Sequence, residues 1–308
     1  LCHPDFSPEQ MQLIVDIQAR MEAQAKAPFR EVFDLITKAP VSVAVVNELR
    51  EANHLPLENI AEKEELEMPD EERTQQEPIN FRITDDDLGA GGPKSKFRAN
   101  MDAIHLLKKL ENEERLATPE EQEVLSRFVG WGGISQAFDP ENQEWSNKYA
   151  EVKAALTPEE YREARASMLN AFYTSPTVIK AMYEALGNMG LSSGNVLEPS
   201  CGIGNFMGLV PDAMEGLRMY GVELDSVSGR IARQLYQKNQ IAVQGFEETE
   251  FPDSFFDCVI GNVPFGQYKV NDRRYDRYNF LIHDYFIARS LDLTRPGGVV
   301  AVVTSAGT

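Results

Sequence analysis

The sequence predicts an α/β protein with a Rossmann-like fold, in which a mainly parallel sheet follows a helical N-terminal region. Three observations support this fold class. Beyond residue 166, short apolar runs alternate with amphipathic helical patterns. A loop with two glycines follows the first run, and an acidic residue ends the second. Strands that alternate with helices pair in parallel, and they bind their ligands at the carboxyl ends of the strands.

The expected strands are short runs rich in apolar and β-branched residues. They lie at residues 195–197, 219–222, 241–243, 258–260 and 299–303. Helical patterns lie between them, at residues 176–186, 226–238 and 280–291. This order implies a sheet that is covered by helices on both faces.

The first 80 residues are predicted to be a helical segment followed by an acidic linker. Apolar residues recur at helical spacing between residues 7 and 38. Residues 51–80 are acidic and interrupted by three prolines, so they bury too little apolar surface to order themselves. We therefore place a domain boundary near residue 80.

Residues 81–165 are expected to form a helical extension that precedes the sheet. Isoleucine and leucine mark one face of a helix over residues 99–114. Thr118 is suited to cap a second helix, with Pro119 as its first residue. That helix ends in the sequence Gly130-Trp131-Gly132-Gly133. Three glycines around a tryptophan permit a tight turn held close to a neighbouring helix or to a ligand, and we favour packing against a helix.

The charge of the chain limits the ligands that it can bind unaided. Its 308 residues carry a formal net charge of −19, and acidic residues are concentrated between residues 55 and 87. Phosphate contacts come mainly from lysine and arginine, so strong unaided binding of a nucleic acid is not expected. The segment from Lys269 to Arg277 is an exception, because basic residues outnumber acidic ones there.

The sequence favours a soluble protein without a metal site. The longest apolar stretch, at residues 298–303, is far shorter than the ~20 residues of a membrane-spanning helix, and no basic-then-apolar leader opens the chain. The three cysteines lack CxxC spacing, which favours small buried thiols over a disulfide framework or a metal site. We expect a cytoplasmic protein with no membrane partner. Because residue 1 is leucine and the chain stops just after an apolar run, we also expect a piece of a longer polypeptide.

The first candidate ligand loop leaves the first strand and enters a helix. It reads Leu197-Glu198-Pro199-Ser200-Cys201-Gly202-Ile203-Gly204-Asn205-Phe206. Gly202 and Gly204 let the backbone pass close beneath a bound molecule. A dinucleotide fingerprint would need a third glycine where Met207 stands. Glu198 fits poorly beside a pyrophosphate, but it suits the positive ammonium of a methionine moiety.

Acidic residues also follow the next two strands. Glu223 ends the second strand, where a carboxylate can accept hydrogen bonds from both ribose hydroxyls. The alternative is a solvated acid at the end of a strand. After the third strand, Phe246 could cover an adenine ring and Glu247 could reach its amino group. A core phenylalanine and a surface glutamate explain this short stretch equally well.

The fourth strand ends in the sequence Asn262-Val263-Pro264-Phe265. The asparagine carboxamide oxygen and the backbone carbonyl of Val263 can both accept hydrogen bonds from an exocyclic NH2 group. Such bonds keep the nitrogen lone pair available for attack on a methyl sulfonium. Phe265 offers a face on which an extruded base can stack. The alternative is a strand-ending turn in which asparagine and proline are chosen for shape.

These motifs together resemble the amino-methyltransferase family, whose catalytic motif is Asn/Asp/Ser-Pro-Pro-Tyr/Phe. The resemblance covers residues 166–308, the expected catalytic domain. The order of parts is similar to that of the gamma group of N6-adenine DNA methyltransferases, with Ala171-Phe172-Tyr173-Thr174-Ser175-Pro176 ahead of the glycine loop. More narrowly, residues 81–308 resemble the very large methylase–helicase proteins of phages and conjugative elements, through Phe97-Arg98-Ala99-Asn100, the Gly130-Trp131-Gly132-Gly133 turn and residues 261–268.

The resemblance implies methyl transfer from S-adenosyl-L-methionine to the exocyclic amino group of adenine in DNA. It implies that Phe172, Thr174 and Pro176 line the methionine end of the cofactor. The expected cofactor residues are Phe172, Thr174, Pro176, Glu198, Pro199, Ser200, Gly202, Gly204, Phe206, Glu223, Leu224, Phe246 and Glu247. The expected catalytic residues are Asn262, Val263, Pro264 and Phe265.

The chain departs from the family pattern in two respects. Val263 stands where proline is usual, so the catalytic loop is expected to be less rigid, although the backbone carbonyl is kept. The family's sheet continues with an antiparallel hairpin and a target-recognition domain, whereas this chain stops at about the fifth expected strand. We therefore expect weak DNA binding by this chain and a helicase domain as a partner in the same polypeptide.

Two other functions fit the same motifs. A protein glutamine N-methyltransferase would present a side-chain amide, with the same NH2 chemistry, to the same loop. A non-catalytic cofactor-binding module of a helicase polypeptide would keep the loops without the reaction. His283 and Asp284 could accept a proton, but we favour structural roles for them, because amino methylation can lose its proton to water. Residues 268–278 alternate aromatic and basic side chains, as in a loop that grips a nucleic-acid strand or in one that is simply solvated.

Overall fold

The computed structural model describes residues 77–85, 89–168 and 174–304. The helix expected over residues 7–38, most of the expected linker and Phe172 lie outside these ranges. The domain boundaries stay predictions. Within the described residues, no helix is long and apolar enough to cross a membrane.

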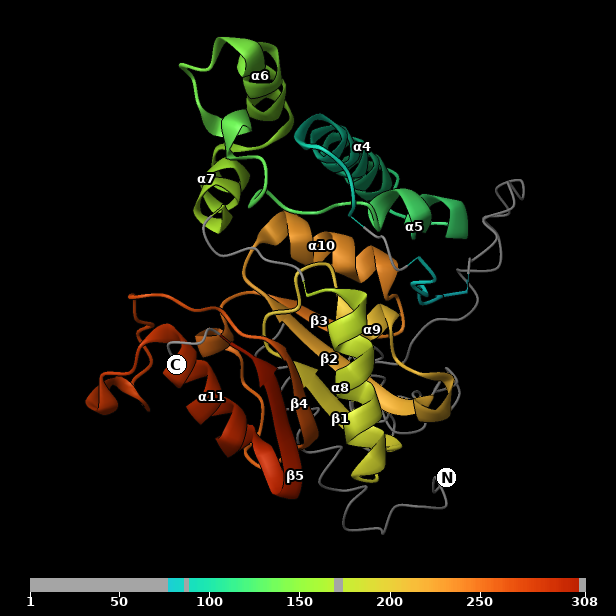
Figure 1. The fold of residues 1–308 in the computed structure, drawn as a ribbon, viewed down its shortest axis with the longest axis vertical. Coiled ribbons are helices and arrows are strands. Elements are labelled where there is room, and N and C mark those ends of the chain that lie inside the picture. Colours follow the sequence, from blue (N-terminus) through green and yellow to red (C-terminus); the bar gives the residue numbers. More distant parts are fainter. Residues whose placement is uncertain (1–76, 86–88, 169–173, 305–308) are drawn as a thin grey trace, which may run out of the picture. The chain divides into compact units, whose positions relative to one another are not determined.

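Helices precede the sheet and then alternate with its strands (Figure 1). The helices are α4 (Pro93–Asn112), α5 (Pro119–Leu125), α6 (Ser146–Ala155), α7 (Pro158–Ser167), α8 (Pro176–Asn188), α9 (Asn205–Gly208), α10 (Ser226–Leu235) and α11 (Ile282–Leu293). The strands are β1 (Ser193–Glu198), β2 (Gly216–Glu223), β3 (Gln240–Val243), β4 (Phe256–Asn262) and β5 (Thr294–Val303). Short 3-10 turns lie at Ser135–Phe138, Gln143–Trp145, Asp212–Met214, Phe246–Glu248 and Asp276–Tyr278.

The five strands form one sheet in the order β3-β2-β1-β4-β5, and every neighbouring pair is parallel. This confirms the predicted Rossmann-like α/β fold, and each strand contains the run that predicted it. β5 begins earlier than expected, because Thr294 already pairs with Phe256 before a register shift brings Val299 opposite Cys258. The intervening Pro296 and Gly297 disfavour a regular strand, so this irregular start could not be predicted from the sequence.

The sheet is covered on both faces. Neighbouring residues of β1 point to opposite sides, so Val196 packs in one hydrophobic cluster and Leu197 in the other. The first cluster includes residues of α8, α9 and α10, and the second includes residues of α11. This double cover explains why the strands are apolar runs rather than alternating patterns.

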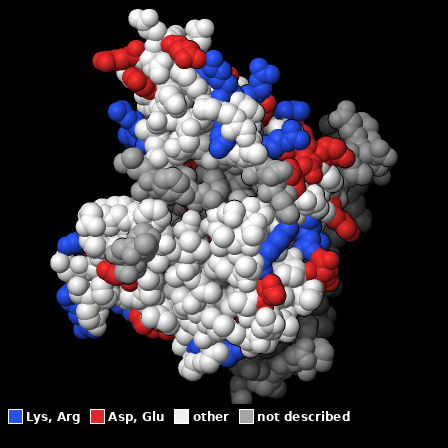
Figure 2. All heavy atoms as spheres, viewed as in Figure 1, with Lys and Arg blue, Asp and Glu red and all other residues white. Residues whose placement is uncertain are grey.

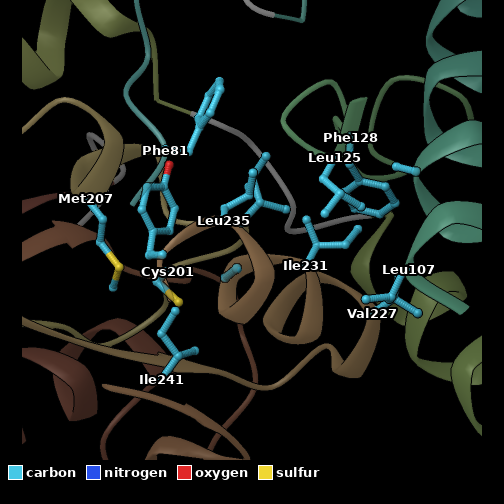
Figure 3. Packing of buried hydrophobic residues seen from close by; sticks show 14 of the residues in the cluster. Phe81, Leu107, Leu125, Phe128, Cys201, Met207, Val227, Ile231, Leu235 and Ile241 are labelled. Carbon is cyan, nitrogen blue, oxygen red and sulfur yellow. The ribbon is translucent and has the colours of Figure 1, made fainter. Parts of the chain in front are cut away.

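The helical extension packs against α10 rather than directly on the sheet. Figure 3 shows Val227, Ile231 and Leu235 of α10 near Leu125 and Phe128 of the extension. Because α10 also packs against β2 and β3, its side chains are buried on more than one face. The extension and the sheet therefore share one hydrophobic core.

Polar contacts reinforce this interface. Arg230 of α10 donates to Glu111 of α4, at 3.0 Å, and forms an ion pair with Glu160 of α7. Lys108 of α4 lies 3.0 Å from the other oxygen of Glu160. Glu160 is buried, and its carboxylate is therefore held by two cations from two different helices. The described part of the extension is thus fixed to α10 by both packing and charge.

The helix starts follow the expected capping chemistry. Thr118 accepts a hydrogen bond from the backbone of Glu121, and the Glu121 side chain accepts one from the Thr118 backbone. α4 begins at Pro93, earlier than residue 99, because proline suits the first turn of a helix. Trp131 of the expected tight turn is buried, and its ring lies 5.0 Å from that of Phe138. The tryptophan of this turn therefore packs in the hydrophobic core.

Candidate active site

A cavity of about 590 Å³ opens at the carboxyl ends of β1, β2 and β4. These strands end at Glu198, Glu223 and Asn262 respectively. Parallel pairing places the three ends at the same edge of the sheet. The loops that follow them supply most of the cavity wall.

Most of the residues expected in the site line this one cavity. From the expected cofactor set they are Thr174, Glu198, Pro199, Ser200, Gly202, Phe206, Glu223, Leu224, Phe246 and Glu247. All of the expected catalytic residues, Asn262, Val263, Pro264 and Phe265, line it as well. Segments far apart in the sequence thus meet around a single space.

Of the expected cofactor residues that the structure describes, two do not line the cavity. Gly204 has a left-handed backbone (φ +88°), and a Cβ atom there would collide with the ring of Tyr236. The structure therefore gives Gly204 a role in close packing instead of contact with the cavity. Pro176 starts α8 as its first residue and lies away from the lining.

The Glu223 carboxylate ties the glycine loop to the end of β2. Its Oε2 accepts a hydrogen bond from the backbone N–H of Gly202 at 2.7 Å, and its Oε1 accepts one from Asp225 at 2.8 Å. A carboxylate oxygen has two acceptor positions, so each can accept one more hydrogen bond. Burial and, to a lesser extent, the neighbouring charge of Asp225 raise the pKa of Glu223 to about 7, although hydrogen bonds from backbone N–H groups lower it.

Glu198 is a buried acid with an unsatisfied oxygen. Its side chain is 2% exposed, and Oε2 has no hydrogen-bond partner among the described residues. Burial raises its pKa well above the ordinary value, and the charge of Glu223 adds to the effect. Two acids that face one cavity in this way favour a positively charged ligand.

Three further buried oxygens of cavity-lining residues also lack partners in the described part of the chain. They are Oγ1 of Thr174, Oδ1 of Asn205 and Oδ2 of Asp225. With Oε2 of Glu198, they offer several acceptors in a space where the described residues supply no matching donor. An ammonium group has three N–H donors and a positive charge, so the α-ammonium of a methionine moiety fits these acceptors.

The catalytic loop is held on two sides. The Ser200 hydroxyl donates to the backbone carbonyl of Asn262 at 2.7 Å, and the backbone N–H of Val263 donates to the carbonyl of Val303 at 3.1 Å. The Val263 side chain is buried in the hydrophobic cluster beneath α11. The expected loss of rigidity at Val263 is therefore offset, because valine keeps an N–H that proline lacks.

Two arginines of the loop after the catalytic motif already contact other residues of the protein. Arg274 forms ion pairs with Asp253 at 2.7 Å and with Asp292 at 2.8 Å. Arg277 covers the ring of Tyr278 at 4.6 Å. Arg274 is consequently not available as a phosphate contact without breaking two ion pairs.

The cavity is also lined by residues that were not among the expected site residues. Gly130 and Glu163 come from the helical extension, and Ala166 and Ser167 end α7. The others are Cys201, Asn205, Asp225, Ser228, Gln244, Gly245, Tyr268, Val270, Ile282 and Phe286 from the sheet region. Asp225, two residues after Glu223, could have been found from its position as the cap of α10. His283 is buried and Asp284 is not, and neither lines the cavity, which supports structural roles for both.

Comparisons with known proteins agree with this geometry. The Eco57I restriction-modification methylase family matches residues 218–307. Defense against restriction protein B of Escherichia phage P1 is 30% identical over 220 residues, which are 70% of this chain and 8% of that protein. Type II methyltransferase M.CvrRI of Paramecium bursaria Chlorella virus XZ-6E is 35% identical over 94 residues, 30% of this chain and 24% of that protein. The chain thus spans less than a quarter of the length of either relative.

Among solved structures, this chain is similar to a Listeria monocytogenes protein that is provisionally named a class I S-adenosylmethionine-dependent methyltransferase. The TM-score is 0.40 and the identity 16%, over 70% of this chain and 75% of that chain. The predicted resemblance to a DNA amino-methyltransferase domain is confirmed by the family match and the viral relative. The chain carries a methyltransferase domain, and its cofactor is S-adenosyl-L-methionine.

Proposed function

We propose that this chain transfers a methyl group from S-adenosyl-L-methionine to the exocyclic amino nitrogen, N6, of adenine in DNA. The observation that carries the proposal is that Asn262 and Phe265 line the same cavity as Glu198 and Glu223. The cavity therefore brings neutral acceptors for an NH2 group next to acids suited to a cationic cofactor. The matched methylase family supports DNA as the substrate.

The cofactor residues position the reacting methyl group. The Glu198 carboxylate, with Asn205 and Thr174, would hold the α-ammonium, and Glu223 would accept hydrogen bonds from the ribose hydroxyls. S-adenosyl-L-methionine supplies an electrophilic methyl carbon on a sulfonium. Fixing both ends of the cofactor leaves the methyl group little freedom to turn away from the target amine.

The catalytic loop prepares the acceptor. The Asn262 carboxamide oxygen and the Val263 carbonyl would each accept one N–H of the adenine amino group, which keeps the nitrogen lone pair directed at the methyl carbon. Transfer to this nitrogen would exchange the S–C bond of the cofactor for a new N–C bond, with the S–C electrons left on sulfur. The surplus proton then leaves the nitrogen for water, so no buried general base is needed.

The substrate must reach this loop as an unpaired base. A base inside a duplex hides its amino group, so the nucleotide has to be extruded or single-stranded, and Phe265 provides a face for stacking. On the face shown in Figure 2, basic and acidic side chains are interspersed over the helical extension, and much of the face below it is uncharged. With a net charge of −19, unaided binding of a phosphate backbone should be weak.

We further propose that the domain belongs to a longer, cytoplasmic polypeptide. The resemblance to methylase–helicase proteins of mobile elements and the match to a much longer phage protein support a helicase partner within the same polypeptide. A cytoplasmic location follows from a DNA substrate. These statements concern the longer polypeptide and are tested with it.

The test is to incubate the full-length polypeptide with radiolabelled S-adenosyl-L-methionine and DNA, and then to digest the DNA to nucleosides. We expect label in N6-methyl-2′-deoxyadenosine, and a rate of labelling lower by ~10²–10³ or more with the Asn262→Ala variant. Label on cytosine would refute the choice of adenine. Label on glutamine of an added protein would establish the protein methyltransferase, and the absence of any transfer despite cofactor binding would establish a non-catalytic module.

A further inference from the structure

The wall of the cavity is not built by the sheet loops alone. Gly130 and the last turn of α7, with Glu163, Ala166 and Ser167, also line it. Gly130 and Glu163 precede the region that the family resemblance places in the catalytic domain, and Ala166 and Ser167 are the first residues of that region. They lie opposite a turn between β2 and α10 that carries Leu224 and Asp225, because those residues line the same cavity and α7 packs on α10.

Glu163 is bonded directly to this turn. Its Oε2 accepts a hydrogen bond from the Ser226 hydroxyl at 2.5 Å and another from the Ser226 backbone N–H at 3.1 Å. Ser226 is the first residue of α10, and the first N–H groups of a helix have no partner within the helix. Glu163 supplies that partner from a different helix, so the position of the turn depends on α7.

The turn between β2 and α10 lines the part of the cavity where the ribose is expected. Leu224 is 69% exposed and lines the cavity directly after Glu223. Asp225 is 9% exposed, and its Oδ2 has no partner among the described residues, although its Oδ1 accepts from the Ser228 N–H at 2.7 Å. The turn therefore presents an unused buried acceptor to the cavity beside the one at Glu223.

The other contact of the extension is fixed just as firmly. Asn100 of α4 is fully buried; its Nδ2 donates to the carbonyl of Gly130 at 2.7 Å, and its Oδ1 accepts from Val129 at 2.8 Å. Gly130 has a left-handed backbone, with φ +65°. A buried side chain thus sets the position of a glycine that faces the cavity.

We propose that the helical extension is one wall of the cofactor site, and that Glu163 is a positioning residue that holds the β2–α10 turn against the ribose of the cofactor. Glu163 acts through Ser226 and Asp225 on Glu223, and it needs no contact with the methyl group. The Asn100–Gly130 contact holds the other part of this wall. The inference concerns cofactor binding, so it stands or falls separately from the choice of adenine as the methyl acceptor.

The test is calorimetric titration of the protein with S-adenosyl-L-homocysteine. Glu163→Ala should raise Kd by about tenfold, the loss expected for one charge-assisted contact. Glu163→Gln should recover much of the affinity, because its amide oxygen can still accept from Ser226. Glu159→Ala is the matched control, since Glu159 is an exposed acid on the same helix that pairs with the exposed Arg162 at 2.9 Å.

A double-mutant comparison separates positioning from general stability. If Glu163 acts through the turn, Glu163→Ala combined with Glu223→Ala should bind no worse than Glu223→Ala alone. Unchanged Kd in Glu163→Ala, or fully additive losses in the double variant, would overturn the proposal. Should Glu163→Ala fail to fold, Ser226→Ala removes one of the same two hydrogen bonds and is expected to weaken binding several-fold, with unchanged binding again counting against the proposal.

Discussion

The two halves of the cavity differ in charge and in how they are held. The cofactor half is acidic, with Glu198 buried and Glu223 bonded to two backbone N–H groups. The acceptor half is neutral, and Asn262 and Phe265 are only partly buried. Buried acids select a cation, whereas a neutral amide leaves an amine uncharged and nucleophilic. The two halves therefore differ in their electrostatics. Substitutions in the acceptor half should lower the rate of methyl transfer, and substitutions in the cofactor half should weaken cofactor binding.

The largest effect is expected in the acceptor half. Asn262→Ala removes a hydrogen bond to the amino group as it is methylated, and the amine loses its alignment with the sulfonium. We expect the rate of methyl transfer to fall by ~10²–10³ or more. The Kd for S-adenosyl-L-homocysteine, measured by calorimetry on the same protein, should stay nearly unchanged. A normal rate of adenine methylation by this variant would refute the assigned role.

The cofactor half should show the opposite pattern. Glu223→Ala would remove the two proposed hydrogen bonds to the ribose, each worth roughly 1.5–3 kcal/mol when charge-assisted, so Kd should rise at least tenfold. The variant also leaves the N–H groups of Gly202 and Asp225 without their acceptor. Glu215→Ala, at an exposed acid just before β2, is the control and should bind normally. Unchanged affinity in Glu223→Ala would exclude it as the ribose ligand.

A smaller loss is expected where the base stacks. Phe265→Ala should weaken productive binding of the substrate by ~1–3 kcal/mol per lost stack, which appears as a raised KM for DNA. Phe265→Tyr keeps the ring and should behave like the parent protein. Steady-state kinetics at saturating cofactor would separate the two variants, and a loss confined to kcat would argue against stacking in the bound state.

Both halves were predicted in part because their signals are local. Glu223 and Asn262 each end an apolar run, and parallel pairing brings such ends to one edge of a sheet. The wall formed by Glu163 escaped prediction, because an acid within an amphipathic helix is typical of a solvated face. Its role depends on which turn of another helix lies opposite, and that contact spans 63 residues of sequence.

Backbone chemistry explains the remaining differences. Gly204 was expected beneath the ligand, but a glycine also permits close packing, and here the ring of Tyr236 occupies that space. The early start of β5 was hidden by Pro296, which usually marks the end of a strand. In both positions the residue type allows two structures, and only tertiary contacts decide between them.

The pH dependence of cofactor binding offers a milder perturbation of the acidic half. The pKa of Glu223 is raised to about 7, so in the free protein its stabilising contribution is fully present below the ordinary pKa of a glutamate and is lost as the pH rises through about 7. Only the ionised form accepts hydrogen bonds from both ribose hydroxyls. The affinity for the cofactor should therefore rise by about tenfold between pH 6 and pH 8. Calorimetry on Glu223→Gln should show a smaller rise over this range, which would come from the remaining buried acids Glu198 and Asp225, and an equal rise in that variant would assign the effect to those acids.

The smallest effect is expected at the departure from the family motif. Val263→Pro restores the usual residue but removes the N–H that donates to Val303 at 3.1 Å, and it alters the apolar contacts of a buried side chain. Losing one such hydrogen bond costs about 1 kcal/mol, so we expect a modest fall in thermal stability without a gain in activity. Val263→Ala keeps the N–H and removes only side-chain volume, which distinguishes the two causes. If Val263→Pro were instead more stable and more active, the bond to β5 would be unimportant, and stiffness of the loop would limit the acceptor half.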